Sequence, residues 1–229
     1  MALTPAQLLT RIGSAHERLR DAVAGLTDER ARGASELPDW TRGHVLTHLA
    51  ELSAAFLRQT EYAVEGRLIE VYDGGRPARA AAIEAGAGRP AAQLAEAVTT
   101  GARRLATAWA AVDGRGWARP VTYRDGVLLD IAFCWWREVN IHLVDADLGY
   151  RPSDWSPEFC GHALDFLAPR SPDGVRLVLR PDGGEPGREW GSGPAVVVAG
   201  ALTDLTAWLA GRRPDGPLLG RLPELGPWP

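Results

Sequence analysis

The chain has 229 residues, enough to bury a substantial core in one large domain or in a helical body with a small appendage. Its 25 Lys and Arg residues nearly balance 29 Asp and Glu residues, which argues against binding to nucleic acid or to an anionic membrane, because either surface requires a basic excess. Every basic residue is arginine, which excludes Schiff-base catalysis by lysine and a Walker-type phosphate loop.

Cysteine content and hydropathy indicate the compartment. The two cysteines, Cys134 and Cys160, form no CxxC pair, so a disulfide framework is not expected and a reducing cytoplasm fits better. The first residues, MALTPAQLLTRIG, lack the charged region and long apolar run of a secretion signal. No segment reaches about 18 uninterrupted apolar residues, the length that a membrane span requires. We therefore expect a cytoplasmic protein that does not insert into a membrane.

Two helices are predicted near the start of the chain. The first begins at Thr4, which can cap the helix and form a capping box with Gln7. Apolar residues then recur at helical spacing as far as about Gly25. The second helix begins after Thr41 and continues to about Gly66. Its apolar stripe comprises Val45, Leu49, Leu52 and Phe56.

The middle of the chain contains two more long helices. Residues 67–89 predict a short helix followed by a mobile linker, GAGRP, and the third long helix is expected from about residue 90 to residue 112. The stretch WARPVTYRDGVLL at 117–129 has an extended pattern. The fourth long helix is predicted over residues 128–148, with Gly149 as its stop.

The sequence changes character after residue 150. A short helix capped by Ser156 precedes two strand-like segments, at 175–180 and 195–199. An amphipathic helix over residues 200–211 and a tail rich in proline and glycine follow. These elements predict a small α/β appendage, which is too small to be stable unless it packs on the rest of the chain.

The predicted fold class is α with a small α/β appendage. The four long helices each carry one apolar face, which is typical of an antiparallel four-helix bundle. Facing helices of such a bundle can place a metal site in its core. We therefore predict a metal-binding bundle over residues 1–152 and a short α/β C-terminal domain over residues 153–229.

The residues best suited to chemistry lie on two of these helices. Cys134, Glu138 and His142 recur at steps of four, so they share one helix face. His44 and His48 are also four apart, on the second predicted helix. One of these histidines together with Glu138 and His142 would make a sensible zinc-ligand set. Three protein ligands leave one coordination position open, as in catalytic zinc sites.

Spacing alone leaves several alternatives. A histidine on an apolar helix face is often a hydrogen-bonded core residue, and a Glu and a His four apart often form only a surface hydrogen bond. Either His44 or His48 could supply the imidazole. Cys134 could be a fourth ligand, but its thiolate would close the site, so we interpret it as a small buried hydrophobic residue. Trp40, just before the histidine helix, is a candidate for lining the pocket.

Three stretches resemble one known family. TRGHVLTHLAEL at 41–52 and WREVNIHLVDADLG at 136–149 resemble the two signature stretches of the mycothiol-dependent maleylpyruvate isomerase family, in the DinB-like superfamily of metal-binding helical bundles. VVVAGALTDLTAWLAGR at 196–212 is similar to the small C-terminal domain of the same family. Three motifs in the right order are more specific than any one of them, and they span most of the chain.

The resemblance implies a metal and a thiol cosubstrate. It favours His48 over His44 and implies that His48, Glu138 and His142 bind a divalent metal, which we expect to be zinc. It also implies mycothiol, whose sulfur would take the open position as a thiolate. In the isomerase, that thiolate adds to the cis double bond of maleylpyruvate, the new single bond rotates, and elimination gives the trans isomer. The expected partners are therefore a low-molecular-weight thiol and a small electrophile.

One departure from the family pattern leaves the reaction open. Where family members commonly carry an Asn-Ala-Asp run, this chain has Leu52-Ser53-Ala54, so mycothiol transfer to a xenobiotic or a biosynthetic intermediate is the alternative to isomerisation. Either reaction needs a cation for the substrate's carboxylate or developing enolate, and we expect Arg212 to be this catalytic residue. Arg212 could instead complement a helix C-terminus. A non-catalytic module that binds a metal or ligand is the remaining alternative.

Overall fold

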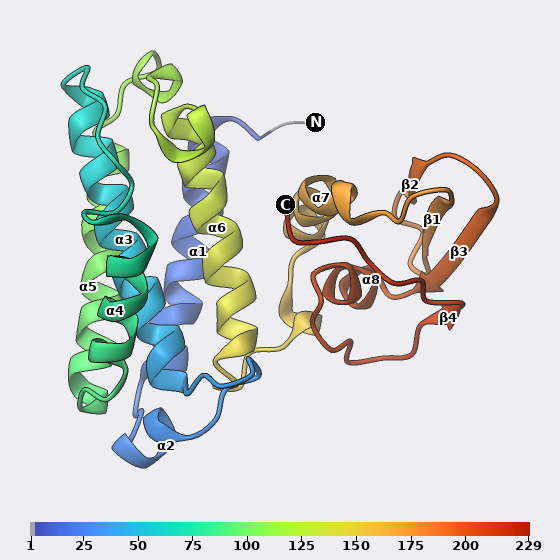
Figure 1. The fold of residues 1–229 in the computed structure, drawn as a ribbon, viewed down its shortest axis with the longest axis horizontal. Helices are drawn as coiled ribbons and strands as arrows, with labels where there is room; N and C mark the ends of the chain where they lie inside the picture. Colours follow the sequence, from blue (N-terminus) through green and yellow to red (C-terminus); the bar gives the residue numbers. More distant parts are fainter. Residues whose placement is uncertain (1–2) are drawn as a thin grey trace. The chain divides into compact units, whose positions relative to one another are not determined.

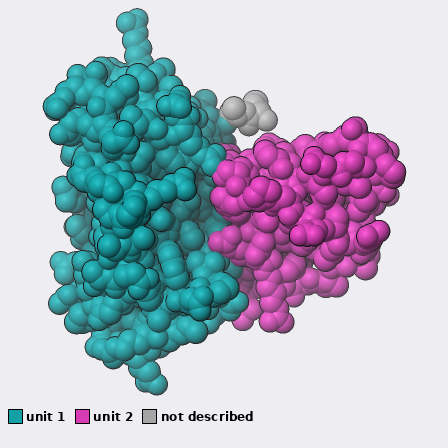
Figure 2. All heavy atoms as spheres, in the orientation of Figure 1, with its two compact units in different colours: residues 1–149 teal, residues 150–229 magenta. Residues whose placement is uncertain are grey.

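The computed structural model describes residues 3–229, and the chain divides into two compact units, residues 1–149 and residues 150–229 (Figure 2). The first unit is helical, and the second combines helices with a four-stranded sheet (Figure 1). This architecture agrees with the predicted fold class, a helical bundle followed by a small α/β appendage.

Four long helices form the body of the first unit. α1 packs on α5 and α6, and α3 packs on the same two helices, so the four surround one core (Figure 1). A further helix, α4, packs on α3. The helices of this unit are α1 (Pro5–Val23), α2 (Asp28–Arg32), α3 (Arg42–Val64), α4 (Gly75–Ala87), α5 (Ala91–Ala110) and α6 (Leu128–Asp145), with short 3-10 turns η1 (Gly116–Ala118) and η2 (Tyr123–Asp125).

Local sequence explains how the two N-terminal long helices begin. In α1 the Gln7 backbone N–H donates to Thr4 Oγ1 at 3.3 Å, and the Thr4 backbone N–H donates to Gln7 Oε1 at 2.9 Å, which is the predicted capping box. Thr41 caps α3 by accepting a hydrogen bond from the His44 backbone N–H. The apolar stripe of α1 is buried as expected and comprises Leu8, Ile12, Ala15, Leu19 and Val23.

Two adjacent helix pairs run parallel, unlike those of a purely antiparallel bundle. One pair is α1 with α6, where His16 and Arg18 contact Trp135 and Asn140 in the same order along the chain. The other pair is α3 with α5. Their C-terminal ends lie together, as shown by the hydrogen bond at 2.9 Å that Trp109 Nε1, near the C-terminus of α5, donates to Thr60 Oγ1, near the C-terminus of α3. α4 makes this possible by returning the chain to the starting end of α3 before α5 begins (Figure 1). α3 and α6 remain antiparallel.

Packing also corrects two boundaries. The linker expected at 86–90 begins inside α4, because Gly86 is packed on α3: a Cβ atom there would meet Thr47 Cγ2 at 2.5 Å. α6 ends at Asp145, three residues earlier than expected, because Asp147 takes a left-handed conformation with φ of 49° before Gly149 is reached. The stretch at 117–129 forms no strand. It contains most of η1, all of η2 with an isolated bridge between Pro120 and Val127 on either side of it, and the start of α6.

The second unit contains a mixed sheet with strand order β2-β1-β3-β4. β1 and β3 are parallel, whereas β2 and β4 pair antiparallel with them. The two predicted strands are β1 and β3, and the short edge strands β2 and β4 were not expected. The elements are η3 (Pro152–Asp154), α7 (Pro157–Leu167), η4 (Ala168–Arg170), β1 (Arg176–Pro181), β2 (Arg188–Gly191), β3 (Ala195–Gly200), α8 (Leu202–Leu209) and β4 (Leu219–Gly220).

The core of this unit lies between the two central strands and α8. Leu177, Leu179 and Val198 are buried on the strands, and Leu205 and Leu209 are buried on α8. α8 packs on β1, on β3 and on α7. Burial on one face of the central pair explains the alternating pattern of β1 in the sequence.

Candidate metal centre

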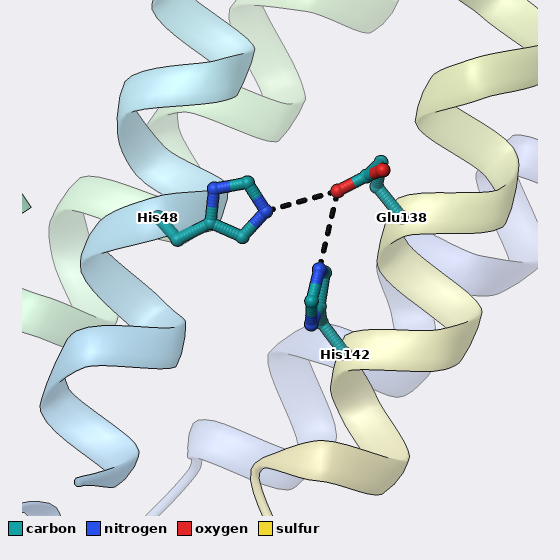
Figure 3. Close-up of side chains that lie close together, drawn as sticks. All are labelled: His48, Glu138 and His142. Carbon is teal, nitrogen blue, oxygen red and sulfur yellow. Dashed lines mark hydrogen bonds and ion pairs between the residues drawn. The ribbon is translucent and has the colours of Figure 1, made fainter. Parts of the chain in front are cut away.

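The structure brings His48, Glu138 and His142 together (Figure 3). His48 projects from α3, and Glu138 and His142 project toward it from α6, one turn apart. Glu138 Oε2 lies 2.9 Å from His48 Nε2 and 3.2 Å from His142 Nε2. The two imidazole rings meet edge to face, with centres 4.6 Å apart. Residues 90 positions apart in the chain therefore meet because α3 and α6 are adjacent.

Two of the three separations between possible ligand atoms suit a tetrahedral metal ion such as zinc, and all three atoms lie within 4.8 Å of one another. Ligand atoms about 2.0–2.2 Å from zinc lie about 3.3 Å from one another in this geometry, and both contacts to Glu138 are close to that separation. Two imidazoles and one carboxylate also form a chemical set that binds zinc with an open fourth position. The side chains of His48 and His142 are 4% and 14% exposed, and that of Glu138 is 25% exposed. The cluster is thus enclosed without being sealed.

Asp145 supports the cluster from the far side of His142. Its buried carboxylate oxygen Oδ2 lies 2.8 Å from His142 Nδ1. Burial by itself would lower the pKa of His142, but the carboxylates of Asp145 and Glu138 outweigh burial and raise this pKa to about 9. A carboxylate beside the second ring nitrogen is the usual means of orienting a metal-binding histidine.

Glu138 is held in its ionised form. Burial would raise the pKa of its carboxyl group, but His142 and His48 on either side hold this pKa well below its ordinary value. An ionised carboxylate between two imidazoles is ready to accept a cation. It needs no proton release at neutral pH before it can act as a ligand.

His48 has different surroundings. Burial lowers the pKa of His48 to about 4, so the ring is neutral at pH 7. Arg79 on α4 donates from Nη2 to His48 Nδ1 at 2.8 Å. A guanidinium only donates hydrogen bonds, so the single proton of the neutral ring lies on Nε2 and points toward Glu138.

His44, the alternative ligand, lies outside the cluster. His44 Nδ1 accepts a hydrogen bond from the Thr41 backbone N–H at 3.1 Å and lies 2.7 Å from Thr41 Oγ1, so this ring completes the cap of α3. Trp40 stacks on His44 with ring centres 5.9 Å apart and meets His48 edge to face at 6.0 Å. Trp40 therefore lies beside the cluster, and its role in lining a pocket stays a prediction.

Cys134 shares the α6 face with Glu138 but is not in the ligand group. The Tyr123 hydroxyl donates to Cys134 Sγ at 3.1 Å. Burial raises the pKa of the Cys134 thiol to about 12, so it is protonated at neutral pH. These surroundings suit a small buried hydrophobic residue and do not suit a thiolate ligand.

A cavity of about 260 Å³ lies between α3 and the segment that contains α4. Arg79 connects this cavity to the cluster, because its side chain both lines the cavity and contacts His48. Both small and charged side chains line it. The lining residues are Glu51, Ala54, Ala55, Arg58, Val71, Tyr72, Asp73, Ala78, Arg79 and Ala82.

Arg212, the expected catalytic cation, lies in the second unit, just after α8. Its Nη1 donates to the backbone carbonyl of Ala210, the C-cap of α8, at 2.8 Å. Its guanidinium carbon lies 5.4 Å from the centre of the Trp228 ring. The contact with Ala210 is the helix-terminal role that the sequence left open, and a role in catalysis stays a prediction.

Two residues of the site were not predicted. Asp145 follows His142 by three positions on the same helix, so the spacing of the motif contained a signal for it. Arg79 carries no comparable signal. It belongs to a segment expected to be partly a linker, and only the packing of α4 on α3 brings it to His48.

Two family models match the chain. Residues 12–147 match the mycothiol maleylpyruvate isomerase N-terminal domain, and residues 154–227 match the C-terminal domain of the same family. None of the curated proteins compared with the chain matches it. Across residues 3–229, no helix combines the length and the apolar character that crossing a membrane requires.

Two solved structures have the same fold. One is the crystal structure of the mycothiol-dependent maleylpyruvate isomerase, and the other is a histidine-to-alanine variant of it. Each is 22% identical to this chain, with a TM-score of 0.86, and the alignment covers 99% of this chain and 98% of the other. The alignment therefore includes residues of both units.

Proposed function

The chain belongs to the mycothiol maleylpyruvate isomerase family, and we propose that it is a zinc-dependent enzyme that uses mycothiol to isomerise a cis double bond by thiol addition and elimination. A zinc ion held by His48, Glu138 and His142 would stabilise the mycothiol sulfur as a thiolate and so supply a nucleophile at neutral pH. Cys134 and Cys160 are free thiols, which supports a reducing, cytoplasmic location.

One observation carries this proposal. Three side chains from two helices converge so that one carboxylate oxygen lies 2.9 Å and 3.2 Å from two imidazole nitrogens. A simple helix-surface pair of Glu138 and His142 would not require a third residue from α3. The buried Asp145 behind His142 adds the support that a metal-binding ring needs.

The chain's own residues would divide the remaining work. Asp145 keeps His142 Nδ1 engaged and so keeps Nε2 directed at the site. Trp40 beside His48 restricts the access of water to the buried ring. We assign to Arg212 the stabilisation of negative charge that develops on the substrate as the thiol adds and that disappears when elimination restores the double bond.

Transfer of mycothiol to another electrophile is the second candidate. The position of Ala54 favours it. Ala54 belongs to Leu52-Ser53-Ala54, the run that departs from the family pattern, and its side chain lines the cavity beside the cluster. A methyl group in place of a polar side chain changes what this cavity can bind. The substrate could therefore differ from maleylpyruvate even though the proposed metal ligands are the same.

The first test is metal content. Purified wild type should contain about one equivalent of zinc by mass spectrometry, and His48→Ala should contain little, because two ligands bind zinc much more weakly than three. His44→Ala is the matched control and should keep its zinc. A wild type that binds no zinc even when zinc is supplied would leave a non-catalytic binding module as the better description.

The second test separates the reactions. Zinc-loaded protein is incubated with mycothiol and either maleylpyruvate or a generic electrophile, and products are followed against a reaction without protein. Arg212→Met should lose most of the turnover while keeping its zinc, whereas Arg213→Met, which removes the neighbouring exposed charge, should keep both. If neither substrate is consumed faster than without protein, both catalytic proposals fail.

A further inference from the structure

We propose that Arg79 binds a carboxylate of the electrophilic substrate, and that loading of the metal releases Arg79 from His48 for this purpose. The inference rests on the proposed zinc-dependent function and adds to it a residue of this chain, Arg79, that would hold the carboxylate of the substrate. It also places a cation in the first unit, next to the metal ligands.

The contacts of Arg79 show that its charge has no carboxylate partner. Within residues 3–229, the guanidinium donates to the neutral ring of His48 at 2.8 Å and lies 5.5 Å from the centre of the Tyr72 ring, and no ion pair is formed. Arg58 in the same cavity is different, because it pairs with Asp73 and donates to the carbonyl oxygen of Glu70 at 2.8 Å. Arg79 is thus the cation of this cavity that can accept an anion without breaking an ion pair.

Zinc binding and the present position of Arg79 are incompatible. A neutral histidine that binds zinc through Nε2 carries its proton on Nδ1, which then becomes a hydrogen-bond donor. Arg79 has donors only, so it cannot remain 2.8 Å from His48 Nδ1 once that nitrogen bears a proton. The side chain must turn away, and its long flexible stem allows this without movement of α4.

The cavity between α3 and α4 is where the released guanidinium can act. Arg79 and Tyr72 both line it, and the alanines at positions 54, 78 and 82 leave room for a small acid. Glu51 also lines the cavity and would compete with a bound carboxylate for Arg79. Arg79 is therefore a positioning residue, with Glu51 tuning how strongly the substrate is held.

The first measurement is zinc affinity, which does not depend on catalytic activity. Arg79→Met removes both the hydrogen bond that zinc must break and a positive charge beside the site, so zinc should bind about tenfold more tightly than to wild type. Arg76→Met, which removes an exposed charge on the same helix, should bind zinc like wild type. Competition with a chromophoric chelator measures all three proteins, and equal affinities for Arg79→Met and wild type would overturn the release step.

Binding of maleate, a small cis dicarboxylate, provides the second readout. By calorimetry, zinc-loaded wild type and Arg76→Met should bind maleate at least about tenfold more tightly than Arg79→Met, because a charge-assisted pair is lost. Arg79→Lys should recover part of the affinity, and Glu51→Gln should increase it. Neutral dimethyl maleate should not distinguish the variants.

The outcomes separate this inference from the proposed function. Wild type that takes up zinc while Arg79→Met binds maleate as tightly as wild type would overturn the role of Arg79 and leave the metal centre intact. Wild type that takes up no zinc would overturn both. Selective loss of maleate binding in Arg79→Met, with recovery in Arg79→Lys, would establish the inference.

Discussion

At His142, two carboxylates lie on opposite sides of one ring, with Glu138 next to Nε2 and Asp145 next to Nδ1. At His48, the second ring nitrogen instead accepts a hydrogen bond from Arg79. The two imidazoles of the proposed metal site are therefore prepared differently: His142 is oriented by Asp145 but must lose its Nε2 proton, whereas His48 must exchange its partner.

Asp145 should govern zinc affinity although it does not belong to the ligand group. We expect Asp145→Asn to weaken zinc binding by about 10–100-fold, because the amide supports the His142 ring less strongly than the carboxylate does. Competition with a chelator measures the change. Asp147→Asn, just beyond α6, is the control: it weakens an ion pair with Arg42 but leaves the contacts of His142 in place, so it should have little effect on zinc affinity. Unchanged affinity in Asp145→Asn would argue against the supporting role.

His16 should make the stability of the bundle depend on pH. Trp135 Nε1 donates to His16 Nε2 at 2.7 Å, and burial lowers the pKa of His16 from 6.5 to about 4. Below pH 6.5 the unfolded chain therefore binds a proton that the folded chain does not, and stability falls as the pH drops from 6.5 toward 4. The contribution lost between pH 7.5 and pH 5 is about 2 kcal/mol.

A comparison with His16→Gln tests this dependence. Glutamine can still accept the hydrogen bond from Trp135 but does not titrate in this range. Urea unfolding at pH 7.5 and at pH 5 should show a smaller decrease in the free energy of unfolding for His16→Gln than for wild type. Equal decreases would show that His16 does not contribute to the pH dependence.

At the scale of elements, the position of α4 decides which residues reach the site. α4 packs on α3 through close backbone approaches, and Gly43 at the start of α3 lies against the carbonyl oxygen of Ala87, the last residue of α4. A Cβ atom at Gly43 would overlap this oxygen. The contact keeps α4 against α3, and α4 carries Arg79.

Gly43→Ala should separate these two helices. We expect the free energy of unfolding to decrease by about 1–3 kcal/mol, because an added methyl group has to displace backbone atoms. Gly13→Ala is the matched control on α1, where a Cβ atom would meet nothing within 4 Å, and it should increase stability by up to about 1 kcal/mol. Urea unfolding measures both. A Gly43→Ala protein as stable as wild type would show that α4 can shift without cost.

At the scale of the whole molecule, every proposed metal ligand lies in the first unit, although the family match includes both units. The ligands come from α3 and α6, which also contribute to the core of the bundle. A metal bound by these helices is therefore linked to the folding of the first unit.

Zinc should protect the two units unequally. At free zinc about 1,000-fold above its dissociation constant, binding adds about 4 kcal/mol to the stability of the state that holds the ligands together. Hydrogen exchange followed by mass spectrometry should show slower exchange in α3 and α6, and little change in the strands β1 and β3. His48→Ala should abolish the difference. Equal protection of both units would indicate that the metal is linked to the second unit as well.

Local sequence was sufficient for much of the fold. The capping box at Thr4, the cap at Thr41, the apolar stripe of α1 and the alternation in β1 all follow from interactions between residues near one another in the chain, and the structure contains each of them. The pairing of Glu138 with His142 is likewise a property of one helix.

Tertiary structure decided the features that depend on neighbours distant in the chain. Periodicity cannot show which helices are adjacent, so the parallel direction of α3 and α5 and the packing of α4 appear only in the fold. For the same reason spacing left His44 and His48 as alternatives, whereas the proximity of α3 to α6 places His48 beside Glu138 and leaves His44 in a cap. The approach of Arg79 to His48 depends on the packing of α4 on α3, and local sequence contains no signal for this packing.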